Sequence, residues 1–228
     1  MMGPKARGRR EVFIMWFEQA VVYQIYPLGL CGAPAENDGR LEHRILRLVD
    51  WTEHIRSLGA DTVLLNPVFD SDRHGYDTRD YFHLDPRLGT DDDLAQVCRA
   101  FHRAGLRVLL DGVFNHVGRG FWAFRDVQEK KWDSPYQDWF RLDFGGNTNY
   151  NDGFWYEGWE GHNELVKLNL FNPAVVEHQF QAIRSWVERF AAGRGLLPAP
   201  GVFKAAARLH SEPKARLRFD GRDPPRGL

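Results

Sequence analysis

Three polar side chains follow a short apolar run and are placed to act together on a ligand. Residues 107–110 (Arg-Val-Leu-Leu) predict a strand buried on both faces, as in a parallel sheet. Asp111, Asn115 and His116 come soon after it. The carboxyl ends of parallel strands are where α/β proteins bind ligands, so these residues are candidates for a binding or active site. A structural alternative is that Asp111 and Asn115 cap the turn after the strand.

The composition is that of an ordinary globular protein. Of 228 residues, 43% are hydrophobic and 27% charged, and the net charge is -1. This balance gives no support for a nucleic-acid or membrane-surface partner. Cys31 and Cys98 form no disulfide framework, and we expect reduced thiols in a cytoplasmic protein. No metal-ligand spacing or dinucleotide pattern occurs, so we expect no cofactor, while the oligomeric state stays open.

Strands and helices alternate along the chain. Apolar runs predict strands over residues 20–27, 62–65 and 107–110. Apolar residues at helical spacing predict helices over residues 43–58, after the N-cap Thr90, and over residues 173–190. The sequence of residues 63–69 is echoed in residues 108–114. The pattern predicts successive βα units around a parallel sheet, either a barrel or a doubly wound sheet.

Three stretches lack this regular pattern. Residues 68–86 are polar and predict a long loop. Residues 117–165 hold thirteen aromatic residues between Phe121 and Trp159, and we interpret them as a long excursion between a strand and its helix. The last 38 residues hold five of the twelve prolines, with eight basic and three acidic side chains. We expect this tail to be largely disordered, and no fourth strand to follow Phe190.

Four short sequences occur in the order of the signatures of one known family. They are Val22-Tyr23-Gln24-Ile25-Tyr26-Pro27, His74-Gly75-Tyr76-Asp77, Asp111…Asn115-His116 and Val166-Lys167-Leu168-Asn169. Together they resemble the α-amylase superfamily of glycoside hydrolases (glycoside hydrolase family 13). The last sequence is similar to the form found in neopullulanase and cyclomaltodextrinase relatives. The matches cover roughly residues 16–190.

The resemblance implies an incomplete barrel. The fold class would be α/β, the N-terminal part of a (β/α)8 TIM barrel with an excursion inserted after its third strand. The expected organisation is a disordered basic extension (1–14), a partial catalytic barrel (15–116 and 166–190), an inserted aromatic-rich subdomain (117–165) and an atypical tail (191–228). The chain would then be truncated after its third βα unit, and a reading-frame change in the gene is one hypothesis for the tail.

The resemblance also implies a set of substrate-binding residues: Tyr76, Asp111, Asn115, His116, Lys167 and Asn169. Tyr76 would stack on a sugar ring, and His116 would hydrogen-bond a hydroxyl of the same sugar. Asp111 would be a supporting carboxylate. The substrate would be an α-glucan or maltooligosaccharide. Sugars suit these roles because their C–H faces pack on aromatic rings and their hydroxyls pair with polar side chains.

The three remaining positions have supporting roles in the family. Asn115 would hold its loop. In calcium-binding relatives it also ligates the ion, although this sequence gives no support for calcium. Lys167 and Asn169 would line the cleft beneath the excursion.

The catalytic carboxylates of the family have no match in this chain. Retaining glycosidases need two carboxyl groups roughly 5–5.5 Å apart. The family's nucleophile lies in a G-x-R-x-D motif on the fourth strand, and its acid/base on the fifth. Arg218-Phe219-Asp220 has part of that lettering but no apolar run before it. We therefore expect no catalytic residue and no hydrolysis by this chain.

Three hypotheses remain. The first is an α-glucan hydrolase by family. The second is a non-catalytic remnant or a carbohydrate-binding half-barrel. The third is a different α/β enzyme that shares only barrel-like repeats, against which the ordered matches argue.

Overall fold

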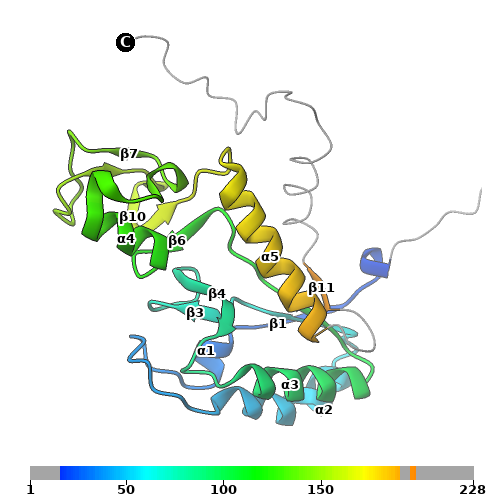
Figure 1. Cartoon of the computed structure of the whole chain (residues 1–228). Coiled ribbons are helices and arrows are strands. Elements are labelled where there is room, and N and C mark those ends of the chain that lie inside the picture. The colour runs from blue at the N-terminus through cyan, green and yellow to red at the C-terminus, as the bar shows by residue number, and fades with distance from the viewer. Residues whose placement is uncertain (1–15, 191–195, 199–228) are drawn as a thin grey trace, which may run out of the picture.

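A four-stranded parallel sheet lies at the centre of the molecule (Figure 1). The structure, a computed structural model, describes residues 16–190 and 196–198. The sheet is built, in spatial order, from β1 (Val22–Ile25), β2 (Thr62–Leu65), β5 (Arg107–Leu110) and β11 (Leu196–Pro198). Because every pair is parallel, the carboxyl ends of these strands share one edge of the sheet.

The two strands that share the repeated sequence, β2 and β5, pair with equivalent residues opposite each other. Val63 is the partner of Val108, and Leu65 is the partner of Leu110. All four side chains are buried. Equivalent positions of two successive βα units therefore lie side by side, as the echo between residues 63–69 and 108–114 predicts.

The predicted helices are present, with one difference in type. Residues 43–58 form a 3-10 helix, η2 (Arg44–Trp51), followed by a short α-helix, α2 (Thr52–Ser57). Ile45 and Leu48 are both fully buried, and their spacing of three puts them on one side of a 3-10 helix. The other two helices are α3 (Asp91–Arg103) and α5 (Pro173–Phe190), which has the predicted bounds.

The stretch predicted to be a long loop contains a hairpin. Strands β3 (Phe69–Ser71) and β4 (Thr78–Leu84) pair antiparallel, so the loop prediction for residues 68–86 is wrong there. The register shifts on both sides of Asp70. These irregularities disturb the alternation of apolar and polar residues by which a strand is recognised in sequence. Tyr81 and Leu84 bury their side chains, and the hairpin supports the loop that carries Tyr76.

The excursion folds into short strands and helices. Its sheets are β6 (His116–Gly118) with β10 (His162–Lys167) and β9 (Gly158–Trp159), and β7 (Leu142–Asp143) with β8 (Trp155–Tyr156). Its helices are α4 (Trp122–Lys130), η3 (Lys131–Asp133) and η4 (Gln137–Trp139). Six of its aromatic side chains are buried: Phe121, Phe124, Trp139, Phe140, Phe154 and Tyr156. These rings belong to the same hydrophobic core as the buried side chains of the parallel sheet.

A fourth parallel strand follows α5, contrary to the sequence prediction. β11 pairs with β5, with Leu196 opposite Val108 and Pro198 opposite Leu110. The strand has only three residues, and a Gly- and Pro-rich context hides so short a run from pattern analysis. The predictions for residues 1–14, 191–195 and 199–228, including Asp220, lie outside the described residues.

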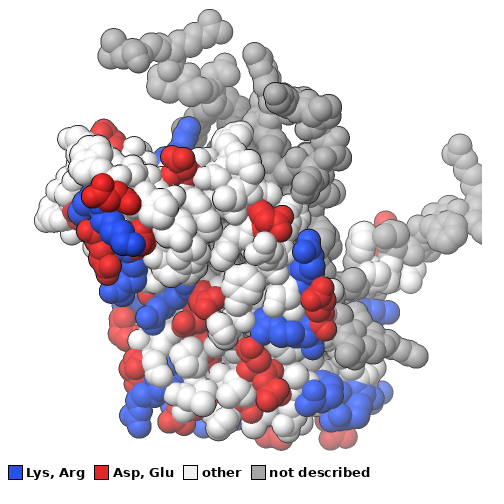
Figure 2. Space-filling model, viewed as in Figure 1, with Lys and Arg blue, Asp and Glu red and all other residues white. Residues whose placement is uncertain are grey.

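Several smaller features complete the description. Two short helices, η1 (Trp16–Glu18) and α1 (Pro27–Leu30), flank β1. Cys31 and Cys98 are free and buried, and burial raises their thiol pKa values to about 11 and about 12. No helix within the described ranges is long and apolar enough to cross a membrane. On the face drawn in Figure 2, acidic and basic side chains are interspersed between uncharged areas.

Candidate sugar-binding site

Asp111 stands at the carboxyl end of β5 and accepts a hydrogen bond from Tyr76. The Tyr76 hydroxyl donates to Asp111 Oδ2 over 3.2 Å and accepts from Asn66 Nδ2 over 2.9 Å. Burial raises the pKa of Tyr76 to about 12, and the Asp111 carboxylate adds to this shift. Burial also raises the pKa of the Asp111 carboxyl, while the Tyr76 hydrogen bond opposes that rise. The ring of Tyr76 is thus tied by its hydroxyl to the ends of two neighbouring strands.

The loop before Tyr76 is held by the carboxylate of Asp77. Asp77 is buried, and its Oδ1 accepts from the backbone N–H groups of His74 and Gly75, both over 3.1 Å. Gly75 has a φ of 94° and passes close to Pro67, whose carbonyl oxygen would lie 3.1 Å from a Cβ at this position. Only glycine fits such a conformation without strain. The glycine of the His-Gly-Tyr-Asp sequence therefore sets the direction in which Tyr76 leaves the backbone.

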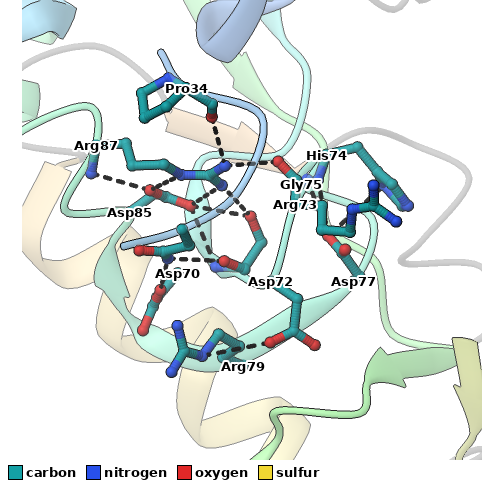
Figure 3. Close-up of polar contacts among 12 residues, drawn as sticks. Pro34, Asp70, Asp72, Arg73, His74, Gly75, Asp77, Arg79, Asp85 and Arg87 are labelled. Carbon is teal, nitrogen blue, oxygen red and sulfur yellow. Dashed lines mark hydrogen bonds and ion pairs between the residues drawn. The ribbon is translucent and has the colours of Figure 1, made fainter. Parts of the chain in front are cut away.

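A buried ion pair that follows β4 holds the base of this loop (Figure 3). Arg87 and Asp85 have fully buried side chains, and their atoms Nη2 and Oδ2 lie 2.7 Å apart. Burial alone would lower the pKa of Arg87, but the hydrogen bonds and charge of Asp85 raise it. Arg87 also donates to Ser71 Oγ and to three backbone carbonyls, those of Pro34, Ala35 and Arg73. One guanidinium thus joins three segments of the chain around the Tyr76 loop.

His116 is buried at the start of β6 and has a free ring nitrogen. Within the described part of the chain, no hydrogen-bond partner reaches His116 Nε2. Its ring lies 5.4 Å from that of Trp159, centroid to centroid. Burial lowers the pKa of His116, and the nearby Tyr76 backbone and Asp77 carboxylate partly oppose this. A neutral imidazole with an unsatisfied nitrogen is suited to a ligand hydroxyl, because leaving it unpaired costs about 1–3 kcal/mol.

The other three predicted residues lie close to His116 in the chain or across the sheet. Asn115 Nδ2 lies 3.4 Å from His116 Nδ1. Lys167 is the cross-strand partner of His116, and its Nζ pairs with Glu157 over 2.8 Å. Asn169 donates from Nδ2 to the backbone oxygen of Asp138 over 2.8 Å, which ties the segment after β10 to the excursion. Their contacts with a sugar, and the absence of a cofactor, stay predictions.

Two further polar residues of this edge were missed in the sequence. Asn66 occupies the position in the first repeat that Asp111 occupies in the second, so the echo itself was the signal. Gln24 lies on β1 and donates from Nε2 to Asn66 Oδ1 over 2.7 Å. No pattern within the β1 sequence indicates this contact, because its partner is 42 residues away.

One known protein family matches most of this chain. The family described as "Alpha amylase, catalytic domain" matches residues 24–196, which include all of these polar residues. The chain belongs to the alpha-amylase family. Neopullulanase 2 of Thermoactinomyces vulgaris is 33% identical over 205 residues, and a cyclomaltodextrinase of a Bacillus species is 33% identical over 189 residues. These alignments cover 79% and 75% of this chain but only 34% of either relative, so the chain spans about a third of their length.

The fold is also that of alpha-amylase family enzymes. The ligand-free cyclic alpha-maltosyl-(1-->6)-maltose hydrolase of Arthrobacter globiformis superposes with a TM-score of 0.68 at 30% identity. The match covers 86% of this chain and 49% of that protein. A cyclomaltodextrinase structure gives a TM-score of 0.68, covering 85% and 36% of the two chains. The four parallel strands and their helices are therefore part of a (β/α)8 barrel, which the described residues leave incomplete.

Proposed function

We propose that this chain binds an α-glucan or maltooligosaccharide at the carboxyl edge of its sheet and supplies that part of a glycoside hydrolase site. The observation that carries the proposal is the pairing of an anchored aromatic ring with a buried, unpartnered imidazole nitrogen. Tyr76 is fixed by Asn66 and Asp111, and His116 Nε2 has no partner among the described residues. The relatives support the sugar class, since their names include a cyclomaltodextrinase and a maltosyl-maltose hydrolase.

Each side chain has a separate role in this proposal. The ring of Tyr76 packs on the C–H face of a sugar residue. His116 Nε2 pairs with a hydroxyl of the same sugar, which relieves its unsatisfied state. Asp111 keeps the Tyr76 hydroxyl in place. Lys167 and Asn169 face the sugar from the side of the excursion.

As a polypeptide of 228 residues, the chain binds without hydrolysing. By family resemblance the nucleophile belongs to a G-x-R-x-D motif on the fourth strand, and the residues from Leu196 onward do not contain it. Without a nucleophile and an acid/base at the required separation, a retaining glycosidase has no route to bond cleavage. Purified protein of confirmed mass should release no glucose or maltose from maltotriose. Measurable turnover would contradict the proposed inactivity but would not contradict the proposed binding site.

Binding is tested by titrating maltotriose into the wild-type protein and two variants in a calorimeter. Tyr76→Ala removes the stacking ring and His116→Ala removes the imidazole, so each should weaken binding by about tenfold or more. The matched control is His83→Ala, because His83 on β4 is 70% exposed and should leave the affinity unchanged. Equal affinities for all four proteins would overturn the proposed site.

A further inference from the structure

We propose that Gln24 and Asn66 are positioning residues of the sugar site, which set the hydroxyl of Tyr76 and through it the ring that meets the sugar. The inference rests on the proposed function for its sugar. It adds two residues to the site, both on the strand ends that face Tyr76. None of the hydrogen bonds described above joins Gln24 or Asn66 to His116 or to the excursion.

The four side chains form one continuous series of hydrogen bonds across three adjacent strands. Gln24 Nε2 donates to Asn66 Oδ1 (2.7 Å), Asn66 Nδ2 donates to the Tyr76 hydroxyl (2.9 Å), and that hydroxyl donates to Asp111 Oδ2 (3.2 Å). Gln24 is on β1, Asn66 follows β2 and Asp111 follows β5. The series therefore runs from strand to strand along the carboxyl edge of the sheet.

The backbone gives this series a rigid base. The N–H of Asn66 donates to the carbonyl of Ile25 over 2.8 Å, and the N–H of Asp111 donates to the carbonyl of Leu65 over 2.9 Å. Sheet pairing thus continues to the residues that hold the hydroxyl. Because these backbone positions are fixed, the distance between Asn66 and Asp111 selects one place for the phenol oxygen between them.

The direction of the series is fixed by its last member. An ionised carboxylate only accepts hydrogen bonds, so the hydroxyl proton of Tyr76 points to Asp111 and its lone pair faces Asn66. Asn66 then presents Nδ2 to Tyr76 and Oδ1 to Gln24, whose amide nitrogen is the donor it requires. A tyrosine with both sides of its hydroxyl engaged offers a ligand its ring rather than its hydroxyl. Gln24 matters because it selects the orientation of the Asn66 amide.

The sharpest test reverses this direction with a nearly isosteric change. In Gln24→Glu a carboxylate faces Asn66, so the Asn66 amide should turn its Nδ2 toward residue 24 and its Oδ1 toward Tyr76. The Tyr76 hydroxyl would then donate to Asn66 and release Asp111. Gln19→Glu is the matched control, because Gln19 is exposed and precedes β1 at the opposite end of that strand.

The readout is the ¹³Cζ resonance of Tyr76 in tyrosine-labelled protein without ligand, assigned by its absence in Tyr76→Phe. We expect this resonance to move in Gln24→Glu and in Asn66→Leu, and to stay in place in Gln19→Glu. Near-ultraviolet circular dichroism shows whether each variant is folded, and Gln24→Glu keeps the test decisive if Asn66→Leu does not fold. An unmoved resonance in folded Gln24→Glu would overturn the proposal.

A double-mutant cycle connects the series to sugar binding. Asn66→Leu should weaken maltotriose binding roughly fivefold in the wild-type background, the effect of losing one hydrogen bond. In the Tyr76→Phe background the same change should have no further effect, because the hydroxyl it positions is gone. Equal effects in both backgrounds would show that Asn66 acts independently of Tyr76. A wild-type protein that binds no maltotriose would instead refute the proposed function, and the ¹³Cζ shifts would still decide whether the two residues set the hydroxyl.

Discussion

At the scale of single residues, the buried ion pair of Asp85 and Arg87 holds together the segments around the Tyr76 loop. Both side chains are completely buried, and Arg87 is the common donor to the segments around the Tyr76 loop. Arg87→Met should lower the free energy of unfolding by roughly 3–5 kcal/mol, because it leaves Asp85 buried without its counter-charge. Urea denaturation measures the loss.

Two variants separate charge burial from loss of the side chain itself. Arg73→Met removes an arginine that is 63% exposed and pairs with exposed Glu36, so its effect should stay below about 1 kcal/mol. In the double variant Asp85→Leu with Arg87→Met, no uncompensated charge remains, and part of the stability should return. If both arginine variants lost equal stability, the buried pair would have no special importance.

His178 gives the molecule a pH dependence that can be assigned to one residue. It lies on α5 against five aromatic rings, those of Tyr81, Phe82, Phe121, Trp122 and Trp139. Burial lowers the pKa of His178, with Asp80 partly opposing the shift. The unfolded chain, with an ordinary histidine pKa of about 6.5, then binds more protons than the folded protein as the pH falls through that value.

Stability contributed by neutral His178 should therefore be present above about pH 6.5 and decline below it. In His178→Gln, the difference between the Tm at pH 7.5 and the Tm at pH 5.5 should be smaller than in the wild type. His83→Gln changes an exposed histidine and should keep the wild-type difference. Because each protein is judged by the difference between its own two Tm values, a loss of packing in His178→Gln that is the same at both pH values cancels. If the difference between the two Tm values in His178→Gln were as large as in the wild type, the assignment to His178 would be refuted.

The sequence indicated Tyr76, Asp111 and His116 as site residues, whereas it did not indicate Gln24 and Asn66. Tyr76, Asp111 and His116 stand in short patterns that are visible without a structure. Gln24 meets Asn66 only because β1 and β2 pair in one register, which places residues 42 positions apart in contact. Asn66 in turn donates to the Tyr76 hydroxyl. Register depends on burial and on the pairing of whole strands, so no local pattern reports it.

At the scale of elements, α3 is the one whose start is most clearly encoded. Thr90 accepts from the Asp93 backbone, and the Asp93 side chain accepts in turn from the Thr90 backbone over 2.7 Å, which forms a capping box. Thr90→Ala should cost about 1 kcal/mol of unfolding free energy, because one orphan N–H of the first turn loses its acceptor. Thr90→Ser keeps the hydroxyl and should recover most of the loss in thermal denaturation. Equal losses in both variants would locate the effect in the methyl group instead.

The elements that escaped prediction share a physical cause. The hairpin of β3 and β4 has register shifts that disturb its alternation, and β11 is only three residues long. The helix over residues 43–58 was recognised, but its first half is a 3-10 helix. In each case tertiary packing overrides a weak local signal, while α5, with five buried side chains along one face, was predicted with its observed bounds.

At the scale of the whole molecule, the sheet ends in an edge strand with apolar side chains. Among the described strands, β1 pairs with β2 alone, and Val21 and Val22 are 53% and 47% exposed. An unpaired edge of this kind is a template for pairing with another copy of the chain. We therefore expect association that grows with protein concentration, measured by light scattering.

A charge on this edge should suppress the association. Val22→Lys places an ammonium group where a second strand would approach, and it should lower the rate of aggregation at micromolar concentration severalfold without lowering the Tm. Leu58→Lys is the control, because Leu58 is 57% exposed at the end of α2 and belongs to no sheet edge. If both variants suppressed scattering equally, general hydrophobicity would be the cause. A specific effect of Val22→Lys would show that the open edge of β1 directs the association, since the two variants add the same charge and remove similar apolar area.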